Sequence, residues 1–265
     1  MQRSAQRCGT PLAYAQPVST ATAAPTPASP TPGPARTAPG ALTPAAQASA
    51  LVPSPLSRRL ADPGAQDVRR AFELARRRFR HGSRVEMGPL AAELGVDRTS
   101  LFRWVGNRDA LLTEVLWSLA APTLDEADAR CGGSGGVHLG AVLTSFASAM
   151  ITADYFRSFL GREPARAMRL LTTTSTQVQR RFTTVTELLV DGEVQAGRFQ
   201  PALPVHDLAY LLVRMSESFT YADLIAGEPP SAERAAAAFA LLLRVPAEAV
   251  LAAVPAEAPA GPARA

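Results

Sequence analysis

Residues 87–106 combine, at fixed spacing, the residue types that two crossing helices need if one of them is to reach into DNA. The stretch reads MGPLAAELGVDRTSLFRWVG. Ala91 is the small residue at the expected crossing point, and Gly95 can adopt the positive φ that ends a helix. The pattern predicts a helix-turn-helix, with the second helix placed for the major groove. Its apolar inner face is formed by Leu90, Leu94, Val96, Leu101 and Trp104.

The segment that follows Gly95 carries side chains suited to reading DNA. Asp97 stands where an N-cap belongs, and short hydroxyls and arginines follow it. Arginine can read guanine, and threonine can contact a thymine methyl group. Asn107 would cap the next helix, where the charge of Arg108 and the helix dipole together favour a phosphate. The candidate DNA contacts are Arg98, Thr99, Ser100, Phe102, Arg103, Asn107 and Arg108.

The charge is distributed unevenly along the chain. Residues 1–118 hold 15 arginines and 8 acidic residues, whereas residues 119–259 hold 11 arginines and 15 acidic residues. The N-terminal part is therefore suited to an anionic partner, of which double-stranded operator DNA is the one that the helix-turn-helix favours. The alternative is a helical adaptor, or an enzyme, whose basic end binds an acidic partner.

Periodicity divides the chain into four parts and predicts an all-α fold. Residues 1–62 hold 11 of the 23 prolines and are expected to be a disordered Ala/Pro-rich tail. Residues 63–112 are expected to form the three-helix DNA-binding domain that holds the helix-turn-helix, 113–246 a helical body, and 247–265 a second disordered tail. Helices are expected over 66–81, 87–94, 107–121 (kinked or ended by Pro122, with a short helix to 129), 137–153, 163–172, 175–197, 205–226 and 231–245.

Other chemistry finds little support in the sequence. Gly132–Gly136 matches the nucleophile-elbow pattern, but no strand is expected before its serine. The three histidines lack acidic or cysteine neighbours at metal-ligand spacing. We therefore expect no catalytic residue, metal or cofactor, so that the chain is not an enzyme. No apolar run suggests a membrane segment, and Cys8 and Cys131 suggest no disulfide framework, which fits a cytoplasmic protein.

The stretch LAAELGVDRTSLFRWVGNRDALLTEVLW resembles the DNA-binding domain of TetR-type regulators. The resemblance implies that Arg98, Thr99, Ser100 and Arg103 contact bases or groove edges and that Arg108 contacts a phosphate. Phe102 departs from the family, which usually has a phosphate-binding tyrosine there. The phrases VLWSLAAPTLDEA and DLAYLLVRMSESFTYADLIAGEPPSAERA resemble the QsdR subfamily, which implies a lactone-like or other small hydrophobic effector.

The resemblance to TetR-type regulators also implies that the helical body, residues 113–246, is an effector-binding and dimerisation domain. An effector pocket would use apolar walls with few polar groups, for which the candidates are Trp117, Phe146, Met150, Phe156 and Tyr221. Arg214 and Glu217 could orient a ligand, hold a dimer seam or simply be solvated. In TetR-type proteins the last two long helices form a homodimer; here these are 205–226 and 231–245, for which an ordinary intramolecular core is the alternative. Effector binding would shift the population and release the operator, as in a repressor.

Overall fold

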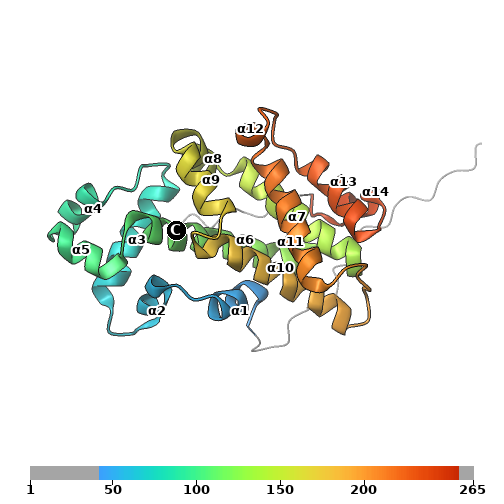
Figure 1. Cartoon of the computed structure of the whole chain (residues 1–265), viewed down its shortest axis with the longest axis horizontal. Coiled ribbons are helices and arrows are strands. Elements are labelled where there is room, and N and C mark those ends of the chain that lie inside the picture. The colour runs from blue at the N-terminus through green and yellow to red at the C-terminus, as the bar shows by residue number, and fades with distance from the viewer. Residues whose placement is uncertain (1–41, 257–265) are drawn as a thin grey trace, which may run out of the picture. The chain divides into compact units, whose positions relative to one another are not determined.

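The computed structural model describes residues 42–256, and all regular structure within that range is helical (Figure 1). The basic end holds α3 (Gln66–Arg80), α4 (Met87–Leu94) and α5 (Arg98–Val105). Gly95 ends α4 with a φ of 71°, and the Asp97 carboxylate accepts the backbone N–H of Ser100 to begin α5. The three helices pack on one another, so the expected helix-turn-helix is present.

Helix α6 (Arg108–Arg130) leaves this domain and runs on into the body. Pro122 does not end the helix and no separate short helix follows it, because α6 continues as one element with Pro122 inside it. A proline removes one backbone hydrogen bond, and burial of the flanking residues Leu119, Thr123 and Leu124 offsets that loss. A single helix therefore belongs to both parts of the protein.

The body is built around α7 (Gly135–Thr152), which packs against α6, α11, α13 and α14. Among the described helices α7 alone is long and apolar enough to span a membrane, but 78% of it is buried in the fold, as in a core helix. Around it lie α8 (Asp154–Arg162), α9 (Pro164–Thr172), α10 (Gln177–Gln195), α11 (Val205–Thr220), α12 (Ala222–Ile225), α13 (Ala232–Leu243) and α14 (Ala247–Ala253).

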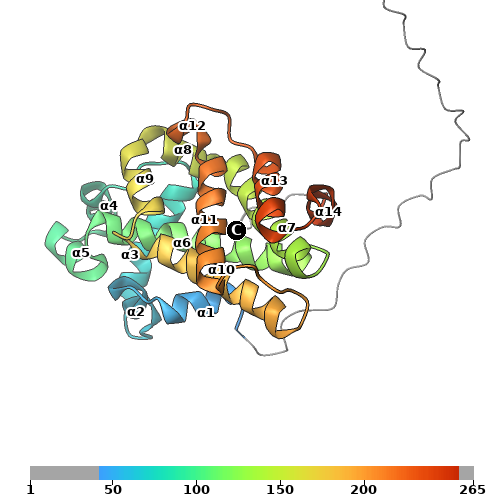
Figure 2. The ribbon, with the colours of Figure 1, turned by 45° about the vertical axis from the view of Figure 1, so that its right-hand side comes forward.

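Both expected tails contain structure. Residues 44–51 and 55–61 form α1 (Pro44–Leu51) and α2 (Pro55–Ala61), so the prediction of disorder was wrong there; α14 corrects the C-terminal tail in the same way. Each early helix begins with an N-cap hydroxyl followed by proline, and Ala45 and Ala48 are small enough to bury completely. Figure 2 shows α1 beside α10 and α2 below α3, and both helices also pack on α6. The rest of the predicted tails, 1–41 and 257–265, lies outside the described residues.

One glycine of the body provides a stability test. A Cβ on Gly135, whose φ is 57°, would lie 2.3 Å from the Arg198 carbonyl oxygen, whereas a Cβ on Gly161 in α8 would meet nothing within 4 Å. We expect Gly135→Ala to lower the free energy of unfolding by about 2 kcal/mol or more because backbone must move. Gly161→Ala should leave it unchanged or raise it. Urea unfolding of the two variants compares them, and an equal effect would contradict the close approach at Gly135.

Candidate DNA interface and effector cavity

Helix α5 presents one face to solvent while the other anchors it. Leu101 and Val105 are fully buried, whereas Arg98, Thr99, Phe102 and Arg103 are exposed. The Arg98 guanidinium lies 5.4 Å from the centre of the Phe102 ring, so these two side chains share the outer face. An exposed helix with arginines and a hydroxyl on its outer face has the form needed to enter a major groove.

Two predicted contact residues take part in helix caps, Ser100 as the partner of the N-cap Asp97 and Asn107 as an N-cap itself. Ser100 donates its hydroxyl to Asp97 Oδ2 at 2.6 Å and its backbone N–H to Asp97 Oδ1 at 2.8 Å. These bonds hold the pKa of the Asp97 carboxyl below its usual value. Asn107 Oδ1 accepts the backbone N–H of Ala110 at 2.8 Å and so caps α6. Ser100 and Asn107 thus position α5 and α6, a role beside the base or phosphate contacts expected from sequence.

Arg108 forms an ion pair within the chain, a role that the sequence prediction of a phosphate contact did not include. Its Nη1 and Nη2 atoms donate to the two carboxylate oxygens of Glu163 at 2.7 and 2.6 Å, and its Nε donates to the Val85 carbonyl. Only 14% of the Arg108 side chain is exposed. The arginine therefore joins the helix-turn-helix to the junction of α8 and α9, and its partner is 55 positions away in sequence.

Glu163 collects further positive charge at this junction. Arg84 Nε lies 3.5 Å from it and Arg166 Nε 3.1 Å. Burial disfavours ionisation of Glu163, but the hydrogen bond and charge of Arg108, with Arg84 and Arg166, outweigh it and hold the pKa below the usual 4.5. The Asp109 carboxylate pairs with Arg166 and Arg169 beside it. This ion-pair network connects the DNA-binding domain to α9.

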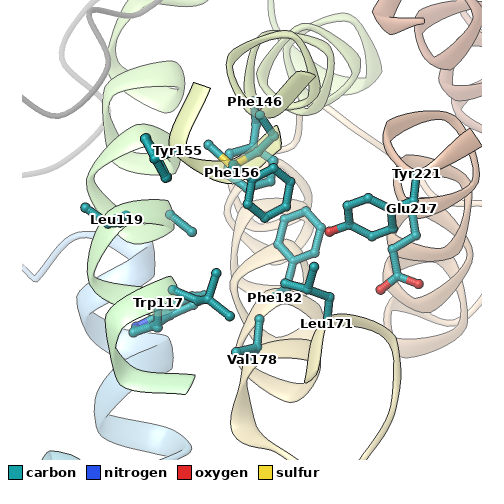
Figure 3. A pocket seen from close by; sticks show the side chains of 13 residues that line it. Trp117, Leu119, Phe146, Tyr155, Phe156, Leu171, Val178, Phe182, Glu217 and Tyr221 are labelled. Carbon is teal, nitrogen blue, oxygen red and sulfur yellow. The ribbon is translucent and has the colours of Figure 1, made fainter. Parts of the chain in front are cut away.

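All five predicted effector residues line one cavity in the body (Figure 3). Trp117 comes from α6, Phe146 and Met150 from α7, and Phe156 from α8, while Tyr221 follows α11. Sequence reasoning did not assign the remaining wall, because it depends on which helices meet; these residues are Leu116, Leu119, Ala120, Tyr155, Leu171, Val178, Phe182 and Glu217.

The cavity is narrow in this conformation. The empty space between its walls is about 540 Å³. Most of that space is too narrow for water, since the centre of a water-sized sphere can reach only about 40 Å³ of it. Sites for small molecules usually measure roughly 300–1,000 Å³, so an effector must push side chains aside. Met150, unbranched and flexible, is the residue most easily moved. Binding in this cavity is therefore coupled to movement of its walls, which include α6.

Polar groups lie at the α11 side of the cavity. Figure 3 shows the Tyr221 hydroxyl directed toward Phe182, inside the wall. Glu217 Oε2 accepts from Arg214 Nη1 at 3.0 Å, and only 6% of Glu217 is exposed. Burial raises the pKa of Glu217 to about 7 although Arg214 opposes the shift, and burial also raises the pKa of Tyr221. Of the possibilities left open for Glu217, the solvated one is wrong.

Replacing Glu163 tests the junction. Glu163→Gln should lower the free energy of unfolding by about 2 kcal/mol near neutral pH, because charge-assisted hydrogen bonds to Arg108 are lost. Since the folded state depresses the pKa of Glu163, its stabilisation is present above pH 4.5 and is lost as the pH falls further. Urea unfolding between pH 3 and 7 measures this. Glu126→Gln, at a more exposed pair with Arg130, is the control, and equal losses in both variants would rule out a special role for Glu163.

Glu217 should make stability fall with rising pH. The pKa of Glu217 is about 7 in the folded state and about 4.5 in the unfolded state. Between these values the folded protein binds more protons than the unfolded chain, so the free energy of unfolding falls as the pH rises. Glu217→Gln should therefore gain on the order of 3 kcal/mol relative to wild type between pH 5 and pH 8. Unfolding at both pH values checks this against Glu233→Gln, an exposed carboxyl on α13. A gain that is the same at both pH values would refute it.

Comparisons with known proteins agree with this geometry. Residues 134–244 match the model of the tetracyclin repressor-like C-terminal domain. The solved structure of the transcriptional repressor QsdR of R. erythropolis, from the TetR family, is similar to this chain, with a TM-score of 0.64 and 30% sequence identity. The match covers 69% of this chain and 97% of QsdR. No curated protein sequence matches significantly. The identity and coverage place this chain in the TetR family of ligand-responsive transcriptional regulators, which are DNA-binding proteins and not enzymes.

Proposed function

We propose that the chain is a homodimeric repressor in the cytoplasm. It leaves a palindromic operator when a small hydrophobic effector enters the cavity lined by Trp117, Phe146 and Tyr221. The observation that carries this proposal is the course of α6. It begins immediately after the recognition helix α5, and further along it forms the cavity wall with Leu116, Trp117, Leu119 and Ala120. An effector that displaces α6 therefore acts on the element that positions α5.

Dimerisation through α11 and α13 is supported by their outer faces. Leu208, Leu212 and Phe239 are buried within the chain, so part of the apolar face expected for dimerisation serves the intramolecular core. Tyr210 and Leu211 on α11 and Leu241 on α13 remain exposed, Leu241 by 82%. Apolar residues on two adjoining helices suit a second copy related by a two-fold axis. Such a dimer would place two α5 helices on successive turns of DNA.

The cavity supports a neutral effector that is mainly apolar with one polar group. A charged group would lose hydration among the aromatic walls, whereas the Tyr221 hydroxyl can donate to a carbonyl oxygen and the Glu217 carboxylate can accept from a hydroxyl. A lactone has this chemistry. The likeness to QsdR, described as a transcriptional repressor, supports repression and membership of the same subfamily for this chain.

DNA fragments from the promoter of its own locus test the function. Fluorescence anisotropy should show sequence-selective binding that weakens with salt, and Arg103→Ala should reduce the affinity roughly tenfold or more. Arg180→Ala, an exposed arginine on α10, is the control for lost charge. A panel of lactones should then release the fragment, and Tyr221→Phe should lower the response without changing operator affinity. Binding that ignores sequence, or is unaffected by Arg103→Ala, would refute the proposal.

A further inference from the structure

Residues 42–61, here called the strap, consist of α1, which packs on α6 and α10, a short connection, and α2, which packs on α6 and α3 (Figures 1 and 2). The first end of the strap is fixed to the body by Asp125 of α6. The Thr43 hydroxyl donates to Asp125 Oδ2 at 2.7 Å, and the Ala45 N–H donates to Asp125 Oδ1 at 3.1 Å. The completely buried Ala45 and Ala48 hold the same helix in the core.

The middle of the strap holds a wall residue of the effector cavity. The Trp117 indole N–H donates to Ser49 Oγ at 2.7 Å, so the strap fixes one edge of a ring that also lines the cavity. The Arg181 guanidinium lies 5.6 Å from the centre of that ring and donates through Nε to the Val52 carbonyl at 2.9 Å. Movement of Trp117 would therefore disturb the strap at two points, Ser49 and Val52.

The charges beneath this contact are fully enclosed. Arg181 is 0% exposed, and its Nη1 donates to Glu114 Oε2 at 3.0 Å. Arg181 Nη2 and Glu114 Oε1 have no hydrogen-bond partner. A buried ion pair with unsatisfied atoms adds little net stability. The hydrogen bond to the Val52 carbonyl is therefore an important part of the hydrogen bonding that compensates the burial of Arg181. The position of the strap and that of Arg181 consequently depend on each other.

The last end of the strap reaches the recognition helix. Arg59 of α2 donates through Nη1 to the carbonyl oxygens of Arg103 and Trp104, at 2.9 and 3.0 Å. These carbonyls belong to the last turn of α5, where the helix dipole also favours a positive charge. Leu56, 2% exposed, fixes α2 in the core of the DNA-binding end. The strap thus joins a cavity wall to the helix that carries Arg103.

We infer that the strap couples the effector cavity to the recognition helix, in addition to α6. This inference rests on the proposed function. An occupant of the cavity that shifts Trp117 changes the bonds at Ser49 and Val52, α1 and α2 move as packed units, and Arg59 transmits that movement to α5. Coupling of this kind is a free energy shared by the two sites, so DNA bound at α5 must weaken or strengthen binding in the cavity by the same factor.

The test measures that factor with N-phenyl-1-naphthylamine, a neutral apolar dye that fluoresces when it enters a dry cavity. The dye is titrated into the full chain with and without the operator fragment found in the promoter experiment. We expect operator to change the dye affinity at least fivefold in wild type. In Arg59→Ala the change should fall to half of the wild-type factor or less, with the remainder carried by α6, while dye and operator each still bind alone. Ser49→Ala should give an intermediate value.

Arg58→Ala is the matched control, since Arg58 is exposed on the same helix and the structure shows no bond from it to α5 among the described residues. It should keep the wild-type factor, and thermal unfolding verifies that each variant is folded. If wild type shows no effect of operator on the dye, the proposed function fails and the inference fails with it. If wild type shows the effect and Arg59→Ala retains it in full, the repressor stands and the strap is only a structural support.

Discussion

The structure depends on the burial of one helix in two places at once. Near its start, α6 buries Leu111, Leu112 and Val115 in the core shared with the DNA-binding helices, and further along it forms the wall of the effector cavity. Packed interiors are close to crystalline in density, so such a helix cannot shift at one end without a response at the other. Arg108 with Glu163 and Arg59 with the end of α5 add directed polar contacts to this apolar connection.

The helix-turn-helix could be predicted because its determinants are local. Gly95 ends one helix, Asp97 begins the next, and both act within a few residues through backbone geometry. The five cavity residues were also found, since large apolar side chains on amphipathic helices face inward. What sequence alone missed depends on distant partners. The role of Arg108 requires Glu163, and the strap requires a surface on which small alanines can bury, which composition does not reveal.

The electrostatics of the two parts follow different rules. At the DNA-binding end the arginines of α5 stay in water, where their charge can steer the protein to phosphates. In the body Arg181 is enclosed with Glu114, and the partly exposed Arg214 pairs with the buried Glu217, whose raised pKa records the cost of burial. The chain has no lysine, so arginine serves both surface recognition and internal pairing. A guanidinium group can do both because it donates to several partners at fixed geometry.

Under the proposed function, the small free volume of the cavity would determine which compounds act as effectors. With so little room available before binding, a candidate molecule is selected by the work needed to rearrange Met150 and the surrounding rings, and only secondarily by fit to an existing shape. Chemically unrelated compounds of similar size and polarity can then produce the same response. Under the same proposal, a compound enters or leaves only when these side chains move, so the protein interior would set the rate of release from the operator.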